Sequence, residues 1–136
     1  MVSLAEQLVG TEPGAARLAR QAAEGRRDVV FLPADATQLP FEDGRFDIVA
    51  TNTTTHHIPR WRQALGEMER VLRPGGYLIY SDFTFPTWLA RRLMAVFGGR
   101  AGVFTGDELD RAFAALGLES VYKATRWYSY EAVFVK

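Results

Sequence analysis

The sequence predicts one domain of the α/β class, a mostly parallel, doubly wound sheet with helices on both faces. Short apolar runs alternate along the chain with segments of helical periodicity, the pattern of strands joined through helices. The composition is globular, with 48% hydrophobic and 24% charged residues. At 136 residues the chain has the length of about one domain. We therefore expect a single domain over residues 1–136, with ligands beyond the carboxyl ends of its strands.

The first part of the chain predicts a helix followed by two strands. Residues 15–24 favour a helix because they are rich in Ala, Arg, Leu and Gln. Residues 29–32 form a short apolar run and are expected to be a strand. Residues 46–50 are a second strand, which the turn at 42–45 separates from the preceding loop.

The middle of the chain predicts a helix, a strand and a further helix. Pro59 suits the first turn of the first helix, whose apolar residues recur at the i, i+3, i+4 spacing of one buried face. We expect residues 74–76, Pro-Gly-Gly, to stop it, residues 77–80 to form a strand and residues 88–97 a helix. The buried face consists of Trp61, Ala64, Leu65, Met68, Val71 and Leu72.

The last part of the chain predicts a capped helix and a pair of strands. Thr105 and Glu108 have the spacing of a capping box, and Gly117 suits the left-handed exit of the helix that they begin. Residues 121–130 and 132–135 are expected to be strands, although the residue between them gives no strong turn signal.

Composition excludes several classes of protein. Sixteen basic and sixteen acidic residues give a net charge of zero, which supports neither a nucleic-acid nor a membrane partner. The absence of cysteine rules out disulfides and thiolate metal sites. The sequence has no signal peptide pattern and no apolar run of about 18 residues, so we expect a cytoplasmic protein.

Polar residues gather where three expected strands end, at 34–36, 51–57 and 81–83. They predict a pocket at one rim of the sheet. Within it, His56 and His57 favour a polar loop or a helix-capping role over a metal site, because adjacent histidines point in different directions. A general base remains an alternative for one of them, since histidine titrates near neutral pH.

Other residues near this rim have two interpretations each. Asp35 either binds a ligand or ties down its own loop. The basic residues after the third polar cluster either receive an acidic substrate or form a solvated face, and the second is favoured. The aromatic residues of that region either line the entrance for an apolar substrate or pack in the core, and packing in the core is slightly favoured. These are Arg91, Arg92, Arg100, Phe83, Phe85, Trp88 and Phe97.

Taken together and in this order, the motifs resemble class I S-adenosylmethionine-dependent methyltransferases. The similarity is greatest to the type 11 group, which includes ubiquinone- and menaquinone-pathway C-methyltransferases. The resemblance implies a Rossmann-like methyltransferase sheet that closes with an antiparallel strand pair. The motifs are Asp35-Ala36, Leu39-Pro40-Phe41, Phe46-Asp47-Ile48-Val49, His56-His57-Ile58 and Arg70-Val71-Leu72-Arg73-Pro74-Gly75-Gly76.

The resemblance also implies S-adenosylmethionine as cofactor and assigns residues to it. Asp35 and Ala36 match the loop that holds the adenine. In the family the acid of this loop binds the adenine amine, and a backbone N–H donates to a ring nitrogen. Thr51 and Asn52 match the loop beside the methionine part of the cofactor.

Catalytic and substrate positions follow from the same resemblance. His56 and His57 match a segment that faces cofactor and substrate. Asp82 and Phe83 follow the next strand, where substrate contacts are usual. The implied function is methyl transfer to a small-molecule acceptor, without a metal.

The beginning of the chain departs from the family pattern, because the usual first strand and its glycine-rich loop are missing. Either residues 8–12 are the second family strand, with Glu12 as the acid that binds the ribose, or residues 10–14 are a degraded glycine loop. A third alternative makes residues 3–9 helical. The first is favoured, since the 23 positions from Glu12 to Asp35 suffice for a helix and a strand.

The missing N-terminal elements bear on two further questions, the oligomeric state of the chain and its activity. An unpaired central strand is adhesive, so we expect a homodimer in which a second copy supplies the missing edge. The alternative to an active methyltransferase is a non-catalytic, methyltransferase-like protein or a fragment that acts, if at all, through protein association.

Overall fold

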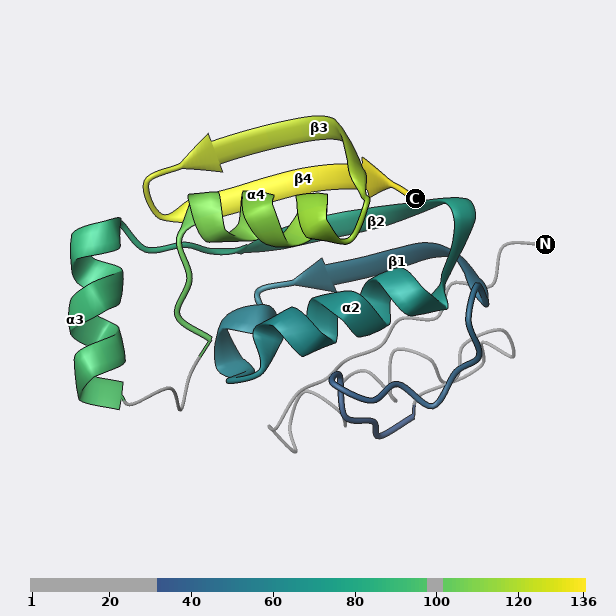
Figure 1. Ribbon diagram of the computed structural model, residues 1–136, viewed down its shortest axis with the longest axis horizontal. Helices are drawn as coiled ribbons and strands as arrows, with labels where there is room; N and C mark the ends of the chain where they lie inside the picture. The colour runs from purple at the N-terminus through teal and green to yellow at the C-terminus, as the bar shows by residue number, and fades with distance from the viewer. Residues whose placement is uncertain (1–31, 98–101) are drawn as a thin grey trace, which may run out of the picture.

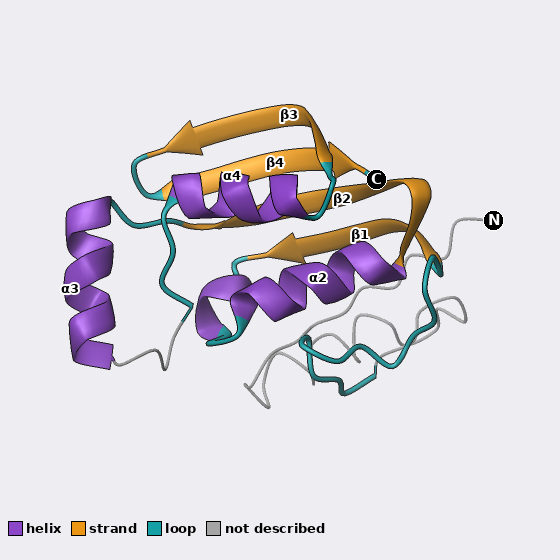
Figure 2. Ribbon diagram, in the orientation of Figure 1, coloured by secondary structure: helices purple, strands orange, loops and turns teal. Residues whose placement is uncertain are grey.

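The computed structural model, which describes residues 32–97 and 102–136, contains a mixed four-stranded sheet (Figures 1 and 2). The expected helix at 15–24, residues 29–31 of the expected strand and Glu12 lie outside the described residues, and Leu32 is not in a strand. The strands are β1 (Phe46–Asn52), β2 (Leu72–Phe83), β3 (Glu119–Arg126) and β4 (Ser129–Val135).

The strand order is β1-β2-β4-β3. β1 runs parallel to β2, whereas β4 is antiparallel to both of its neighbours, β2 and β3. The expected antiparallel pair at the C-terminus is therefore confirmed. Because β4 returns between β2 and β3, the described sheet is mixed, with a single parallel pairing.

The described helical elements begin close to where the sequence places them. Thr105 accepts a hydrogen bond from the backbone of Glu108, whose side chain accepts one from the backbone of Thr105, which confirms the capping box. Gly117 has the expected positive φ of 74°. The elements are the 3-10 turn η1 (Thr55–His57) and the helices α2 (Trp61–Val71), α3 (Thr87–Phe97) and α4 (Gly106–Ala115).

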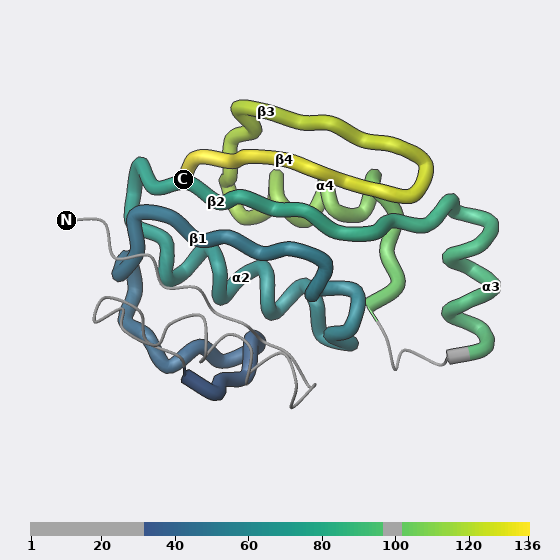
Figure 3. The backbone as a smooth tube through the Cα atoms, turned by 180° about the vertical axis from the view of Figure 1, so that it is seen from behind, coloured from purple at the N-terminus to yellow at the C-terminus, as the bar shows by residue number. Residues whose placement is uncertain are grey.

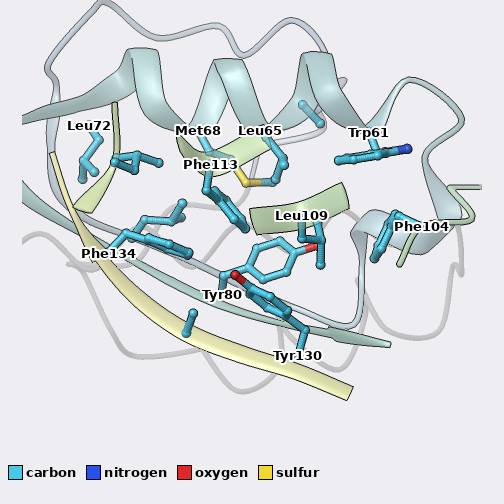
Figure 4. Close-up of a cluster of buried hydrophobic side chains, with 14 of the residues drawn as sticks. Trp61, Leu65, Met68, Leu72, Tyr80, Phe104, Leu109, Phe113, Tyr130 and Phe134 are labelled. Atoms are coloured by element: carbon cyan, nitrogen blue, oxygen red, sulfur yellow. The ribbon is translucent and has the colours of Figure 1, made fainter. Parts of the chain in front are cut away.

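The core lies between the sheet and the helices α2 and α4 (Figure 4). The predicted stripe from Trp61 to Leu72 is buried throughout. Aromatic rings fill the space under α4, where Phe113 lies 5.0 Å from Tyr80 and 4.2 Å from Phe134 between ring centroids. Burial of such large side chains is the main source of stability in a domain of this size.

The opposite face of the sheet carries no helix of the described residues (Figure 3). Ile48, Tyr77 and Ile79 on that face are between 42% and 46% exposed. β1 is also the last strand on its side of the described sheet. Among the described residues, helices therefore pack on one face, whereas the sequence predicts helices on both.

The motif Pro74-Gly75-Gly76 lies inside a strand, whereas the sequence predicts a strand only over residues 77–80. Helix α2 does end before the motif, at Val71. β2 already begins at Leu72 and passes through the motif, with a register shift opposite β1. A Cβ atom on Gly76 would lie 2.9 Å from the carbonyl oxygens of Arg73 and Asp47. Glycine is required there because the two strands approach each other closely.

The boundary between the last two strands also differs from the prediction. Glu131 lies within β4, and the turn is formed by Trp127 and Tyr128. Tyr130 and Ala132 point into the core on either side of the exposed Glu131, which is the alternation of a strand. No helix of the described residues is long and apolar enough to cross a membrane.

Candidate active site at the ends of β1 and β2

The carboxyl ends of β1 and β2 meet at one rim of the sheet because the two strands are parallel. The backbone N–H of Thr53 donates to the carbonyl of Ser81 at 2.8 Å and extends this pairing beyond β1. Thr53 has a φ of 48°, a left-handed conformation that is uncommon for a non-glycine residue. This turn leads the chain into η1, which lies beside the end of β2.

Asp82 is a buried carboxylate whose two oxygen atoms are both occupied. Its Oδ2 atom accepts from the backbone N–H groups of Thr55 at 2.7 Å and His56 at 3.2 Å. Its Oδ1 atom accepts from the backbone N–H of Phe83 and lies 2.6 Å from Nδ1 of His56. The Asp82 side chain is 0% exposed, so it offers no free oxygen to a ligand.

These contacts determine which ring nitrogen of His56 carries the proton. The carboxylate of Asp82 already accepts three backbone hydrogen bonds, so Nδ1 of His56 is the donor in the fourth. In a neutral imidazole the other nitrogen is then an acceptor. Nε2 has no hydrogen-bond partner among the described residues, and the side chain is 19% exposed. His56 therefore presents a basic nitrogen at the rim.

Two rings surround His56. The ring of His57 lies 3.9 Å from that of His56 between centroids, but His57 has no hydrogen bond to Asp82. Phe83 meets His56 edge-on at 5.4 Å and is 45% exposed. The two adjacent histidines thus differ in surroundings, and only His56 belongs to a hydrogen-bonded dyad.

Two hydroxyl groups are buried close to the dyad. Thr55 Oγ1 and Tyr80 Oη are buried without a hydrogen-bond partner in the described part of the chain. Burial, reinforced by the charge of Asp82, raises the pKa of Tyr80, so its phenol stays neutral. The Asp82 carboxylate is itself fully buried, and its interaction with His56 is stronger there than it would be in bulk solvent.

Gly102 is a site residue that the sequence does not single out. Its backbone N–H donates to the carbonyl of His56 at 2.9 Å. A Cβ atom at this position would lie 2.4 Å from the carbonyl oxygen of Thr55 and 2.7 Å from that of Ile58. The segment before α4 therefore presses directly on the backbone of η1, and a side chain would displace it.

The loop before β1 presents Asp35 and Ala36. Oδ1 of Asp35 accepts from the backbone N–H and the hydroxyl of Thr37, at 2.8 and 2.7 Å, and these bonds lower the pKa of Asp35. Oδ2 is 4.0 Å from the guanidinium of Arg60. One oxygen of Asp35 thus ties down its own loop, as one of the two interpretations expects, and the side chain is 63% exposed.

Helix α2 holds this loop in place through Glu67 and Arg70. Glu67 accepts the backbone N–H of Leu39 at 2.7 Å and pairs with Arg70 at 2.8 Å. Arg70 also donates to the carbonyls of Leu39 and Phe41 and to Asp43. The hydrogen bonds to Arg70 lower the pKa of Glu67. An arginine of the predicted motif at 70–76 thus fixes the loop that carries Asp35.

Thr51 and Asn52, the other predicted cofactor residues, form the end of β1. Thr51 is half-buried and Asn52 is exposed. The backbone carbonyl of Asn52 accepts a hydrogen bond from the hydroxyl of Thr54 at 2.8 Å. In the part of the chain that the structure describes, no three His, Asp or Glu side chains are grouped to hold a metal ion.

The parallel pair β1–β2 and the rim of polar residues at its carboxyl end are features of a Rossmann-like α/β fold, in which ligands bind beyond the strand ends. The family model described as "Methyltransferase domain" matches residues 1–80, and the chain belongs to that family. It is therefore a class I methyltransferase domain, as the motifs indicate.

Curated proteins and solved structures agree with this family. The chain is 44% identical over 69 residues, 48% of its length, to demethylmenaquinone methyltransferase of Beutenbergia cavernae. It is 37% identical over 91 residues, 67% of its length, to a probable phthiotriol/phenolphthiotriol dimycocerosates methyltransferase of Mycobacterium ulcerans. The chain spans 29% of the length of each of these two proteins.

Among solved structures, an S-adenosylmethionine-dependent methyltransferase from Methanosarcina mazei has the same fold. The TM-score is 0.71 at 22% identity, over 92% of this chain and 78% of that one. This likeness confirms the Rossmann-like fold that the motifs predict.

Proposed function

We propose that this chain is the methyl-transferring domain of an enzyme that uses S-adenosylmethionine to methylate a hydroxyl or enol of a small, lipophilic acceptor. The observation that carries the proposal is the dyad of His56 and Asp82, 2.6 Å apart at the ends of two parallel strands. Family membership supports methyl transfer. Both curated relatives are named for lipophilic acceptors, which supports the acceptor class.

The donors and acceptors of the Asp35 loop fit part of the cofactor. The backbone N–H of Ala36 has no hydrogen-bond partner among the described residues, and the Asp35 carboxylate is 63% exposed beside it. An N–H donor next to an acidic acceptor complements an aminopyrimidine edge such as that of adenine. Thr51 and Asn52 at the end of β1 would hold the methionine part, and Glu12 remains the proposed ribose acid.

The mechanism needs alignment more than strong catalytic groups. S-adenosylmethionine, when bound, supplies a methyl group on a positively charged sulfur that is open to in-line attack. The acceptor's O–H bond breaks as its proton passes to Nε2 of His56, and Asp82 stabilises the imidazolium that forms. Phe83 would pack against an apolar acceptor. Asp82 is then a positioning residue rather than the substrate contact that the resemblance implies.

The intact dyad gives no support to a non-catalytic protein. Calorimetric titration with S-adenosylmethionine and S-adenosylhomocysteine tests cofactor binding. We expect micromolar affinity, about −8 kcal/mol. Asp35→Ala should weaken it about tenfold, since hydrogen bonds to charged groups contribute about 1.5–3 kcal/mol. Asp47→Ala is the control, because Asp47 is an exposed acid at the far end of β1. No heat from a folded sample would refute cofactor binding.

We further propose that the chain pairs with a second copy. The outer edge of β1 and the exposed Ile48, Tyr77 and Ile79 support this arrangement, because open edges and apolar faces associate. The mass in solution should approach that of a dimer as concentration rises. A monomer mass that does not change with concentration would refute it.

A further inference from the structure

Two exposed tryptophans lie at the end of the molecule where the dyad is found. Trp88 on α3 is 66% exposed and Trp127 in the β3–β4 turn is 74% exposed, whereas Trp61, the third tryptophan of the chain, is buried. The backbone N–H of Thr84, just before α3, donates to the carbonyl of Tyr128 at 3.1 Å. The helix and the turn therefore lie at the same end of the sheet (Figures 1 and 3).

One face of α3 is apolar and exposed. Trp88, Arg92, Ala95 and Val96 have the i, i+4, i+7, i+8 spacing of a single helix face, and all four are exposed. Val96 is 77% exposed. An apolar helix face in water is unfavourable unless something covers it.

The charge of the chain segment around α3 is of one sign. No acidic residue occurs between Phe83 and Gly106, a segment that contains Arg91, Arg92 and Arg100. The net charge of zero over the whole chain conceals this segregation. Arg92 lies on the apolar face itself, between Trp88 and Val96 along the helix.

Acids do occur across the neighbouring cleft, a space of about 620 Å³ that α2, α3 and α4 line. Asp107 and Glu108 face Arg91 from there, together with Arg62 and Arg111. Glu108 is already engaged by the guanidinium of Arg62 and the backbone of Thr105. The cleft lining thus carries three arginines against two acids, and Arg92, which is not part of it, adds a further positive charge on the outer side of α3.

We propose that α3 and the β3–β4 turn form a surface that docks on an anionic lipid bilayer. Tryptophan is the side chain that favours the boundary between headgroups and acyl chains, and arginine beside it attracts acidic headgroups. At 11 residues α3 is too short to span a bilayer, so the contact is peripheral. A lipophilic acceptor would then pass from the bilayer to His56 without crossing water. That consequence rests on the proposed function, whereas the docking does not.

Sedimentation with phospholipid vesicles tests the proposal on the full chain, without cofactor or acceptor. We expect binding to phosphatidylglycerol vesicles and little binding to phosphatidylcholine alone. Each arginine near an anionic surface strengthens binding about fivefold, so Arg92→Gln should weaken it about fivefold. Arg91→Gln with Arg92→Gln should weaken it by no more than about 25-fold, because Arg91 also lines the cleft that holds Asp107 and Glu108. Arg45→Gln with Arg73→Gln is the matched control, because these exposed arginines lie at the opposite end of the sheet.

Fluorescence quenching by brominated lipids locates the contact. Emission of the wild type should be quenched on vesicles. Trp88→Ser with Trp127→Ser leaves only the buried Trp61, whose emission should not change. Equal binding to both lipids, or undiminished binding of the folded arginine or tryptophan variants, would overturn the proposal. If the wild type does not bind vesicles and the tryptophan variants lose the dimer mass, the proposal is overturned and the surface is instead a contact between two copies of the chain.

Discussion

Nδ1 of His56 lies 2.6 Å from Oδ1 of Asp82, although 26 positions separate the two residues in the chain. Asp82 also accepts the backbone N–H groups at the start of η1, so one buried carboxylate fixes both the turn and the ring that the turn carries. This double role places His56 in a single orientation. A general base must be positioned in this way to act at one point on a substrate.

Replacement of Asp82 should lower turnover without abolishing cofactor binding. In Asp82→Asn the amide keeps the size of the side chain but loses the charge that stabilises protonated His56. We expect kcat to fall about 100-fold, the usual contribution of a general base. The affinity for S-adenosylhomocysteine, measured by calorimetry, should change by less than about threefold.

His56 itself offers a sharper version of this test. Added imidazole should restore part of the activity of His56→Ala, because it can occupy the vacated space, but it should not restore Asp82→Asn. His57→Gln is the matched control and should retain activity, since His57 has no bond to Asp82. Equal losses at His56 and His57 would contradict the dyad.

The close approach at Gly102 makes a second prediction. Gly102→Ala would place a Cβ atom 2.4 Å from the Thr55 carbonyl, so η1 must shift. A displacement of about 1 Å at the reacting groups can cost about 100-fold in rate, so we expect a large loss of kcat. Gly66→Ala in α2 is the control, because nothing lies within 4 Å of its added Cβ.

The control variant Gly66→Ala should itself stabilise the fold. Alanine in a helix interior is favoured over glycine by about 1 kcal/mol, so Gly66→Ala should raise the free energy of unfolding. Urea unfolding of Gly66→Ala and Gly102→Ala separates a change in folding stability from a change in kcat. Gly102→Ala with full activity would show that η1 tolerates the displacement.

Arg70 should control cofactor affinity from a distance. It holds the carbonyls of Leu39 and Phe41, so Arg70→Met should loosen the loop that carries Asp35. We expect about tenfold weaker cofactor binding and faster hydrogen exchange at the Leu39 amide. Arg73→Met, which removes only an exposed ion pair with Asp47, should change neither quantity. An unchanged Leu39 amide in Arg70→Met would contradict the role.

The features that the sequence predicts well are local ones. The buried stripe of α2 follows from helical periodicity, and the capping box at Thr105 and Glu108 from a four-residue pattern. The β3–β4 turn was misplaced because Trp127-Tyr128 contains none of the residues that usually mark turns. The turn precedes Ser129 because Tyr130 and Ala132 both pack into the core from the same strand, β4.

The partnerships within the site are not local and could not be predicted from motifs. The polar strand ends indicate where His56 and Asp82 lie, but their contact depends on the register of β1 against β2. The same is true of Gly102, which meets η1 from a segment more than 40 positions later. A motif thus locates the rim, whereas the pairing of strands decides which side chains act together.

The ion pair on α2 predicts how stability depends on pH. Hydrogen bonds from Arg70 and from the Leu39 backbone favour ionised Glu67, so its pKa is lower in the folded state than in the unfolded chain. Its contribution is fully present above the unfolded value of about 4.3 and is lost as pH falls through the folded pKa. Glu67→Gln removes this charge, with an expected cost of about 1.5 kcal/mol at pH 7. Urea unfolding at pH 7, 5, 4 and 3 should show the gap between wild type and variant closing below about pH 4. A gap that stays constant to pH 3 would mean that the ion pair does not stabilise the fold.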